Sequence, residues 1–536
     1  MARVGAEILP KVEALSREKK PDEFSRRDFL AAFPMLAAGG VQVFSRKRSK
    51  APQVPQMLQG GRVYVVLWFD TEDYILPQSD DAAKRLAAFL TQQGIRATFK
   101  VVGEKARELE RRDRRDVIGA LSQHEIGYHS NTHSQHPTVA EYESTLDWQT
   151  GATEFTRRER QGFDRVKRIF EQTPTCYGQP GASWAPQAYA ALRDWGVRVY
   201  LDNGKQLGLD GKPFWYCGML NVFNIRDGDQ LRPDATWSNL SDAKANFQDI
   251  HLRLNSKREG GLVSLYFHPC EFVHREFWDA VNFAHGANPP RAEWKMPPLK
   301  SAAESEKAFQ YFQELVTFMK SFPRVEFVTA SDTLRLYNDS AQRRVYPAED
   351  LGAIAGQVSA DVSFQEHDDY TLNLGEVLFL LNAFVSQIVH KTPPEPILLE
   401  NAPGGPVSAG VPPLPAAVNV SWDQFARTVT DVAGYLRKFN QVPNAVWFGS
   451  QGVPPESYLL ALAQVATRLV GKGAIPDSVS VRPAHLAAAK YVADDSPAIW
   501  DWPIFPEGFH APRLIELGKL QAWTLKPARL AASKPA

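Results

Sequence analysis

Short apolar runs alternate with longer stretches of helical periodicity between residues 61 and 337, and this alternation constrains the fold more than any other feature. It is typical of βα units and predicts a parallel sheet or barrel. Four of the runs stop at a polar residue: Asp70, His129, Asp202 and His268. Because the carboxyl ends of parallel strands meet at one mouth of a barrel, we expect these four side chains to converge there.

Individual elements follow from the same patterns. Residues 63–69 predict a buried strand, and residues 81–93 predict a helix after it. Residues 96–103 predict the next strand, and residues 262–267 predict a later one that ends at His268.

A histidine pair and an acidic cluster are the candidate metal ligands. His129 and His133 lie four residues apart, and two imidazoles at this spacing can bind one ion from one face of a helical turn. The spacing alone is a weak signal. The acids in Asp70-Thr71-Glu72-Asp73, directly after the first strand, offer an oxygen ligand and a base. With only three cysteines and no C-x-x-C motif, a metal site must use histidines and carboxylates.

Length and charge limit the classes of function. A chain of 536 residues predicts two or more domains. The 61 basic residues equal the 61 acidic ones, which argues against nucleic acid or an acidic membrane as the main partner. A small molecule or a neutral polymer fits better. The sequence contains no run of 18 apolar residues, so it predicts no ordinary membrane span.

The N-terminus resembles a bacterial twin-arginine export signal. Ser25-Arg26-Arg27-Asp28-Phe29-Leu30 places two arginines before a modest apolar stretch, residues 29–44. The alternative is an arginine pair at the start of an ordinary amphipathic helix. Residues 1–60 are therefore predicted to be an export signal and a linker, without an obvious cleavage site. The signal is expected to direct the protein to the periplasm, cell envelope or exterior of a bacterium.

The region 344–536 has a different composition and contains an irregular internal repeat. Predicted helices over residues 374–389, 422–439 and 456–470 are each followed by a polar break and the pattern P-x-x-[VI]. The repeat resembles pseudomurein-binding repeats, which implies attachment to a cell wall or glycan. The alternative is an ordinary helical domain whose helices share a turn. The last segment, around residues 500–524, is expected to be a cap without chemical content.

Four motifs between residues 61 and 337 carry a family resemblance: FDTED, GIRATFKVVG, HEIGYHSNTH and LYFH, in that order. With them this region resembles the polysaccharide deacetylase (NodB-homology) family. The resemblance implies a distorted (β/α) barrel over residues 61–343, followed by the mainly helical C-terminal domain. It also implies one divalent metal and hydrolysis of N- or O-acetyl groups on glycans.

The resemblance assigns roles to the catalytic candidates. Asp70 is expected to be the base that takes the proton of the attacking water, and His268 the acid that protonates the leaving amine. A neighbouring carboxylate keeps such a histidine protonated, and Glu271 lies three residues away. Asp202 is expected to correspond to the family's aspartate that supports the acid or the arginine.

The resemblance also implies the ligand set. His129 and His133 supply imidazoles, and the third ligand is Glu72 or Asp73, because Thr71 separates the acids where the family has two adjacent aspartates. Ligand type favours Asp73. We expect Zn²⁺, although two histidines and one carboxylate also suit Co²⁺, Ni²⁺ or Mn²⁺.

One motif departs from the family. The family's arginine, which holds the base ionised, is replaced by Gln179 in Gly178-Gln179-Pro180-Gly181. Arg198 or Arg226 are candidates to replace it from elsewhere.

Six tryptophans lie between residues 183 and 297, and flat aromatic faces stack on sugar rings. Trp184 and Trp278 are the better candidates for a substrate groove, with Gln179 beside them; core packing is the alternative for each tryptophan.

The sequence thus predicts a metal-dependent deacetylase of an N-acetylated cell-wall glycan or exopolysaccharide. The missing arginine motivates one alternative, hydrolysis of a small non-sugar amide or cyclic imide. A catalytically silent, glycan-binding barrel is the other.

Overall fold

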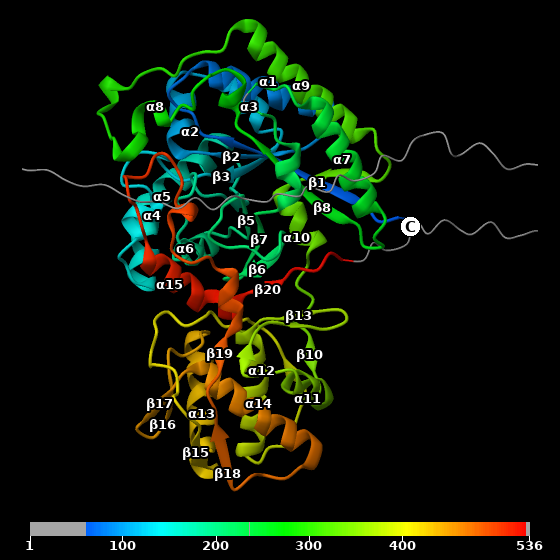
Figure 1. The fold of residues 1–536 in the computed structure, drawn as a ribbon, viewed down its shortest axis with the longest axis vertical. Helices are drawn as coiled ribbons and strands as arrows, with labels where there is room; N and C mark the ends of the chain where they lie inside the picture. The colour runs from blue at the N-terminus through cyan, green and yellow to red at the C-terminus, as the bar shows by residue number, and fades with distance from the viewer. Residues whose placement is uncertain (1–59, 235, 532–536) are drawn as a thin grey trace, which may run out of the picture. The chain divides into compact units, whose positions relative to one another are not determined.

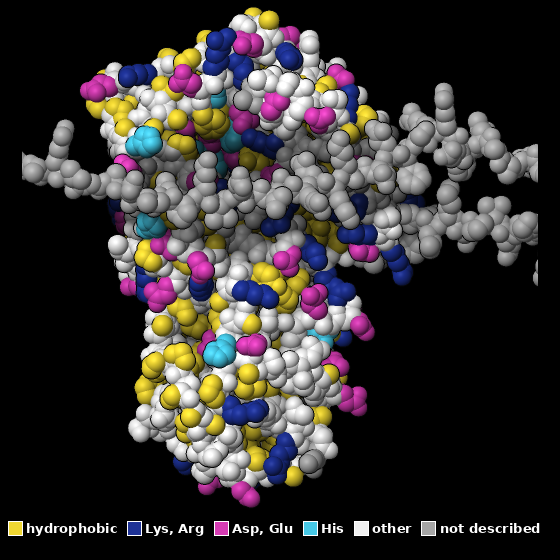
Figure 2. Space-filling model, in the orientation of Figure 1, with side chains coloured by type: hydrophobic (Ala, Val, Ile, Leu, Met, Phe, Trp, Pro, Cys, Tyr) yellow, Lys and Arg dark blue, Asp and Glu magenta, His cyan; other side chains and the backbone are white. Residues whose placement is uncertain are grey.

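The computed structural model describes residues 60–234 and 236–531 (Figure 1). The predicted export signal falls outside these residues, apart from Gly60. Among the described helices, none is long and apolar enough to cross a membrane. Charges of both signs are interspersed over the face in Figure 2, in keeping with the balanced composition.

A curled, mostly parallel sheet forms the centre of the barrel region. Its strands run in the order β20-β6-β7-β5-β4-β3-β2-β1-β8, with β9 beside β1. Within the described residues β8 pairs with β1 alone, so the barrel is open and distorted, as predicted. The strands are β1 (Val63–Thr71), β2 (Thr98–Val101), β3 (Glu125–Tyr128), β4 (Cys176–Tyr177), β5 (Val199–Asp202), β6 (Phe214–Tyr216), β7 (Met219–Phe223), β8 (Gly261–Phe267), β9 (Val325–Val328) and β20 (Lys526–Pro527).

Strand β1 is the centre of this sheet. All nine of its residues are buried, which explains why its sequence is nearly continuously apolar. It pairs in parallel with β2 and β8, and the register sets Asp70 opposite Lys100. The strand predicted over residues 63–69 is confirmed, and so is the strand predicted over residues 262–267.

Helices cover the sheet and bury their apolar faces against it. The helix predicted over residues 81–93 is α1 (Gln78–Gln92). The others in this region are α2 (Gly103–Arg111), α3 (Arg115–Leu121), α4 (Val139–Glu143), α5 (Trp148–Phe170), α6 (Ala188–Asp194), α7 (Leu240–Asn255), α8 (Ala280–Phe283), α9 (Ala302–Lys320) and α10 (Ala330–Leu336). One continuous core joins β1 with helices such as α1, α5 and α9.

The C-terminal region has its own hydrophobic core. Its helices are α11 (Ala348–Gly356), α12 (Leu374–Val389), α13 (Trp422–Phe439) and α14 (Pro455–Lys472), which confirms the three predicted ones. Each P-x-x-[VI] pattern leads into a short strand: β14 (Ile397–Leu398), β16 (Val446–Phe448) and β18 (Ser478–Val481). The repeat is therefore helix, break and strand. Smaller strands complete the region: β10 (Val345–Tyr346), β11 (Asp361–Val362), β12 (Gln365–Glu366), β13 (Thr371–Leu372), β15 (Val418–Ser421), β17 (Gln451–Val453) and β19 (His485–Leu486).

The last segment of the chain packs with the barrel as well as with the C-terminal helices, whose core contains Trp523. Val492, Trp500 and Leu514 belong to the barrel core, and β20 pairs with β6. Helix α15 (Pro512–Leu520) lies in this segment. The region predicted as residues 344–536 therefore contributes apolar side chains to both cores.

Candidate metal and active site

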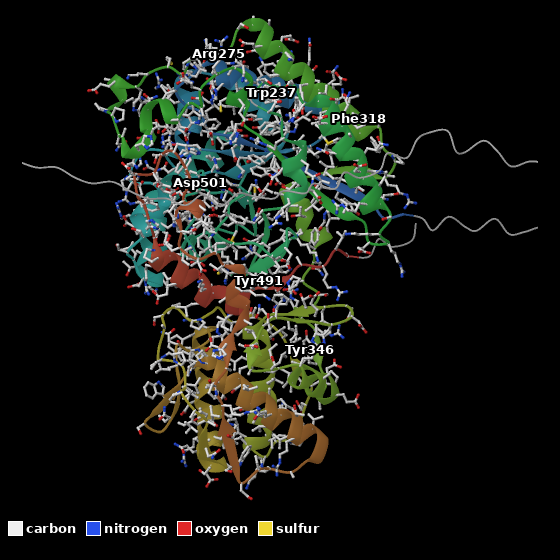
Figure 3. The ribbon with its side chains drawn as sticks, viewed as in Figure 1. Trp237, Arg275, Phe318, Tyr346, Tyr491 and Asp501 are labelled. Atoms are coloured by element: carbon white, nitrogen blue, oxygen red, sulfur yellow. The ribbon has the colours of Figure 1, made fainter. Side chains whose placement is uncertain are left out.

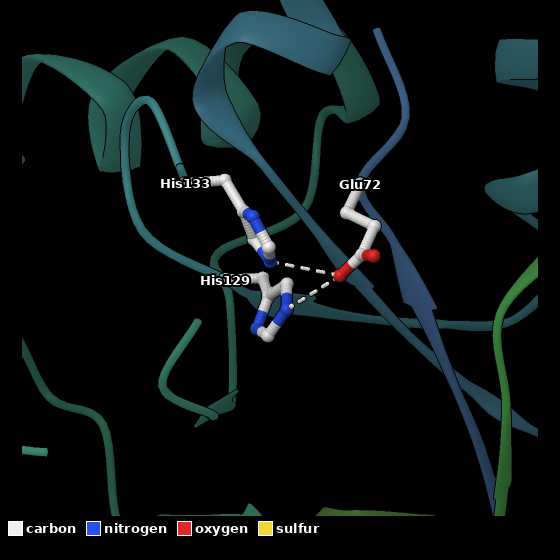
Figure 4. Close-up of side chains that lie close together, drawn as sticks. All are labelled: Glu72, His129 and His133. Atoms are coloured by element: carbon white, nitrogen blue, oxygen red, sulfur yellow. Dashed lines mark hydrogen bonds and ion pairs between the residues drawn. The ribbon is translucent and has the colours of Figure 1, made fainter. Parts of the chain in front are cut away.

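Three buried side chains converge at the carboxyl ends of β1 and β3. Glu72 Oε2 lies 2.9 Å from His133 Nε2 and 3.2 Å from His129 Nε2 (Figure 4). One ligand atom from each residue lies within 4.8 Å of the other two. Two imidazole nitrogens and one carboxylate oxygen thus face one small volume.

The two histidines lie in a loop, not on a helix. The loop follows β3, and its backbone is left-handed at Ser130 (φ 64°) and His133 (φ 54°). The Asn131 amide donates to the buried Glu159 carboxylate at 2.7 Å, which fixes the turn. The expected helical turn is therefore wrong, although the spacing of four residues still brings both rings together.

Hydrogen bonds to the other ring nitrogens orient both histidines. His129 Nδ1 donates to the Gly178 carbonyl at 3.0 Å. His133 Nδ1 donates to Ser134 Oγ at 2.5 Å, and Ser134 donates to Asp279 Oδ2 at 3.0 Å. Both Nε2 atoms are therefore directed toward Glu72, as hydrogen bonds to the other ring nitrogen orient metal-binding histidines.

Glu72 is held by Trp278, whose indole Nε1 donates to Glu72 Oε1 at 2.9 Å. Burial raises the pKa of Glu72, but the charges of His133 and His268 outweigh it and hold this pKa well below its usual range. Trp278 is fully buried, so it supports the carboxylate and has no face free for a sugar. The expectation of a groove tryptophan at this position is corrected.

Asp73, which ligand type favoured, faces away from the histidine pair. Its Oδ1 accepts the backbone amides of Ile75 and Leu76 at 2.9 and 3.0 Å, and closes a turn after β1. Burial raises the pKa of Asp73 to about 6. The structure groups Glu72, not Asp73, with the histidines, because side chains alternate along a strand and the longer Glu72 reaches the loop.

The donor set fits a divalent cation. His133 Nε2 is buried, and among the described residues its 2.9 Å contact with Glu72 Oε2 lacks hydrogen-bond geometry. Such an atom is costly to bury unless another partner satisfies it. Two neutral imidazoles and one carboxylate are a common ligand set of catalytic zinc and related ions, and they leave coordination positions open.

Asp70, at the end of β1, is paired with a lysine. Lys100 Nζ lies 2.9 Å from Asp70 Oδ1 and 3.5 Å from Asp202 Oδ2, and it donates to the Leu201 carbonyl at 2.8 Å. The ammonium also lies 4.1 Å from the ring centre of Trp68. Burial lowers the pKa of Lys100, but Asp70 and Asp202 raise it more, so the lysine is charged.

Lys100 supplies the positive charge that the Gln179 motif lacks. Gln179 is held by a hydrogen bond from the Tyr200 hydroxyl at 2.8 Å. Arg198 and Arg226, the expected replacements, are exposed. Sequence reasoning missed Lys100, although one signal existed: it is the single charged residue in the otherwise apolar run 97–103.

His268 follows β8 and faces Asp70 across the site. Its Nε2 lies 3.7 Å from Asp70 Oδ2, and its Nδ1 donates to Glu271 Oε1 at 2.7 Å. Arg232 donates to the same Glu271 oxygen at 3.0 Å. Burial lowers the pKa of His268, but the negative charges of Glu271 and Glu72 outweigh this effect and raise the pKa to about 9. His268 is thus a proton donor at neutral pH.

These groups line one pocket of about 340 Å³. Asp70, Glu72, His133, Gln179 and His268 lie in its wall, and its aromatic lining includes Trp68, Tyr266, Phe277 and Trp502. Trp184 is fully buried in the barrel core, against Gly518, so its expected role in a substrate groove is also corrected.

Comparisons with known proteins agree with part of this description. Residues 59–200 match the family model for polysaccharide deacetylase. No curated protein matches the chain.

Several solved structures are similar to this chain. A protein from Mycobacterium smegmatis, assigned as a polysaccharide deacetylase, is 16% identical, with a TM-score of 0.33 over 55% of this chain and 93% of that one. A protein from Pseudomonas aeruginosa PAO1 with the same assignment is 11% identical, with a TM-score of 0.34 over 51% and 90%. A CE4-family pseudoenzyme from Bacillus anthracis is 13% identical, with a TM-score of 0.27 over 52% and 66%. Residues 59–200 are thus similar to the polysaccharide deacetylase family model, within a chain whose sheet forms a distorted (β/α) barrel.

Proposed function

We propose that this protein is a metal-dependent hydrolase that removes acetyl groups from an N-acetylated cell-wall glycan or exopolysaccharide. One observation carries the proposal: Asp70 and His268 face each other in a pocket whose wall also contains Glu72 and His133 of the candidate metal cluster. An amide needs an activated water, a stabilised oxyanion and an acid for its nitrogen. This pocket contains a group for each requirement.

The cluster would hold one divalent cation, for which Zn²⁺ is our first expectation. Such an ion, when bound, polarises the amide carbonyl and makes a bound water more acidic. Trp278, Gly178 and Ser134 hold the three ligands in position, so the chain itself sets the geometry of the site.

Asp70 is the proposed base. Its carboxylate lies in the pocket wall, and the Lys100 ammonium lies 2.9 Å from it. An ionised carboxylate accepts the proton of the attacking water. Lys100 is buried behind Asp70 and does not line the pocket, so we assign it a positioning role.

His268 is the proposed acid. It enters the reaction protonated, because Glu271 raises its pKa, and its Nε2 is directed toward the pocket. Transfer of that proton to the amide nitrogen allows the C–N bond to break and the amine to leave. Glu271, held by Arg232, orients the ring through Nδ1.

Export by the twin-arginine route and attachment through the C-terminal repeats complete the proposal. An envelope glycan as substrate fits both, and the balanced charge favours a neutral polymer over nucleic acid.

Acetate release tests the proposed activity. The metal-loaded full-length protein is incubated with chitooligosaccharides, peptidoglycan fragments and an N-acetylated exopolysaccharide. We expect acetate, and we expect a chelator or Asp70→Asn to abolish its release. Asp210→Asn, a change of an exposed aspartate outside the pocket, is the matched control. No acetate from any of these substrates with the metal-loaded protein would overturn the deacetylase assignment.

A further inference from the structure

Part of the pocket wall comes from the end of the chain. Ile499, Asp501, Trp502 and Pro503 line the pocket together with the proposed catalytic groups. We call residues 499–503 the strap. In Figure 3, Asp501 lies in the barrel region, far from Tyr346 in the C-terminal region. The expectation that this last segment has no chemical content is therefore corrected.

Hydrogen bonds hold the strap at both ends. At one end, Gln206 Nε2 donates to the Ile499 carbonyl at 2.8 Å, in the loop that follows β5. At the other end, the His285 amide donates to the Pro503 carbonyl at 2.9 Å, in the segment after β8. The strap therefore runs from the β5 side of the pocket to the β8 side.

Trp502 is the part of the strap nearest the metal cluster. Its ring centre lies 5.6 Å from that of His133, with the two planes at 86°. Gly181, in the motif that carries Gln179, has φ 49°, and a Cβ there would lie 2.4 Å from the Trp502 indole. Only glycine permits this close approach. The tryptophan is therefore fitted between the ligand His133 and the Gln179 loop.

An ion pair also holds the strap at the rim of the pocket. Lys205 Nζ lies 2.5 Å from Asp501 Oδ2, and both side chains are more than half exposed, so the pair contributes little stability. It does place two charged groups at the rim, where they can contact polar groups of a ligand. The aromatic side chains Trp68, Tyr266, Phe277 and Trp502 supply flat apolar faces within the same wall.

The strap limits the size and shape of a substrate. The volume of about 340 Å³ is near the lower end of the range for small-molecule pockets. A polysaccharide bound by an interior unit needs free space on two sides of the scissile amide. The strap occupies space between the β5 and β8 sides.

Resting on the proposed function, we infer that the substrate presents its amide at a free end. The pocket accepts a terminal N-acyl sugar or a compact amide, and it excludes interior units of a long chain. A terminal N-acyl sugar and a compact amide share one chemistry. Each carries a small N-acyl group, and the rest of the molecule extends from that group in a single direction. Trp502 is the specificity-determining residue.

Chain-length dependence tests this inference. Metal-loaded protein is given N-acetylglucosamine, chitooligosaccharides of increasing length, soluble chitin polymer, and small non-sugar amides and cyclic imides. We expect acetate release per acetamide group to fall as the chain lengthens, and tandem mass spectrometry to place the free amine at a terminal unit. Hydrolysis confined to the non-sugar compounds would support the compact-amide form of the pocket inference and overturn the proposed glycan deacetylase activity.

Interior units deacetylated as fast as terminal ones would overturn the inference and leave the proposed function intact. No hydrolysis of any amide would overturn the proposed function, and the inference with it.

Variants of the strap provide the second arm. Trp502→Ala should raise the ratio of polymer to oligomer activity about tenfold, the size of effect that pocket shape commonly has on selectivity. Trp447→Ala is the matched control, because Trp447 is 54% exposed in the C-terminal region, and it should leave the ratio unchanged. If Trp502→Ala does not fold, Lys205→Ala replaces it and should raise the ratio in the same direction. An unchanged ratio of polymer to oligomer activity in folded Trp502→Ala, or in the Lys205→Ala variant that replaces it, would contradict the assignment of Trp502 as the specificity-determining residue.

Discussion

Asp70 and Lys100 lie directly opposite each other on β1 and β2, and their side chains form a buried ion pair of 2.9 Å. Both project from the same face of the sheet, because paired residues of parallel strands share a face. The pair gives the proposed base a cationic neighbour although the Gln179 motif carries no charge. Its position on two central strands makes it part of the barrel core as well as of the site.

Lys100→Met should therefore lower kcat/KM about 10²-fold or more, which is the usual contribution of a general base. The variant should also lose about 3–5 kcal/mol of stability, because Asp70 and Asp202 remain buried without a cation.

A double variant separates the two effects of Lys100. Lys100→Met with Asp70→Asn should regain part of the stability in denaturant titrations but none of the activity. A folded Lys100→Met enzyme with an unchanged kcat/KM would show that the lysine has only a structural role.

The identity of the third ligand is tested by metal content. Glu72→Gln should lose the bound ion, because a neutral amide replaces the carboxylate between the two Nε2 atoms. Asp73→Asn should retain it, since Asp73 contacts backbone amides rather than the histidines. Metal per protein is measured by mass spectrometry after exhaustive dialysis. The reverse result, loss in Asp73→Asn and retention in Glu72→Gln, would assign the ligand to Asp73.

The acid His268 predicts an alkaline limit for activity. Its pKa of about 9 lies above the ordinary value of 6.5, so the protonated form is lost as the pH rises through about 9. For the same reason, the stability that its ion pair contributes is complete below about 6.5 and disappears as the pH rises through about 9.

Glu271→Gln should move the alkaline limb of the kcat/KM profile to lower pH, because Glu271 is the largest cause that raises this pKa. Glu276→Gln, a change of an exposed glutamate nearby, is the control and should leave the limb in place. Both are compared with the wild type under the same metal. Identical limbs in Glu271→Gln and the wild type would argue against His268 as the acid.

The junction of the last segment with the C-terminal region depends on Lys526. Its buried Nζ lies 2.8 Å from both Glu376 Oε1 and Asp339 Oδ1. Lys526→Met should cost about 3–5 kcal/mol in urea titrations, because it leaves the fully buried Glu376 without a cation. Lys438→Met, at an exposed position on α13, is the control with no large effect expected. A loss of less than about 1 kcal/mol in the free energy of unfolding of Lys526→Met would contradict the role of Lys526 in this junction.

Local patterns in the sequence predicted several of the longer helices and strands. The helix expected over residues 422–439 coincides with α13, and the strand expected over residues 63–69 lies within β1. The helix was predictable because burial of one face repeats apolar residues at the helical period. The strand was predictable because burial of both faces makes consecutive residues apolar. Strand ends also predicted that Asp70, His129 and His268 converge, since parallel strands direct their ends to one side.

Details of the site were harder to predict, because they depend on partners distant in the chain. The preference for Asp73 over Glu72 failed since it considered ligand type without the direction of each side chain after β1. Trp184 and Trp278 were expected to face a groove, yet both are buried, because composition does not distinguish an exposed aromatic face from a packed one.

By itself, the sequence determined the elements, the barrel and the strand ends that carry the candidate catalytic residues, because each depends on patterns within a few consecutive residues. Tertiary structure alone decided that Lys100 is the partner of Asp70, that Glu72 joins the histidines and that Trp502 closes the pocket. Each of these contacts joins segments far apart in the chain. Such contacts follow from strand register and packing, which local periodicity does not encode.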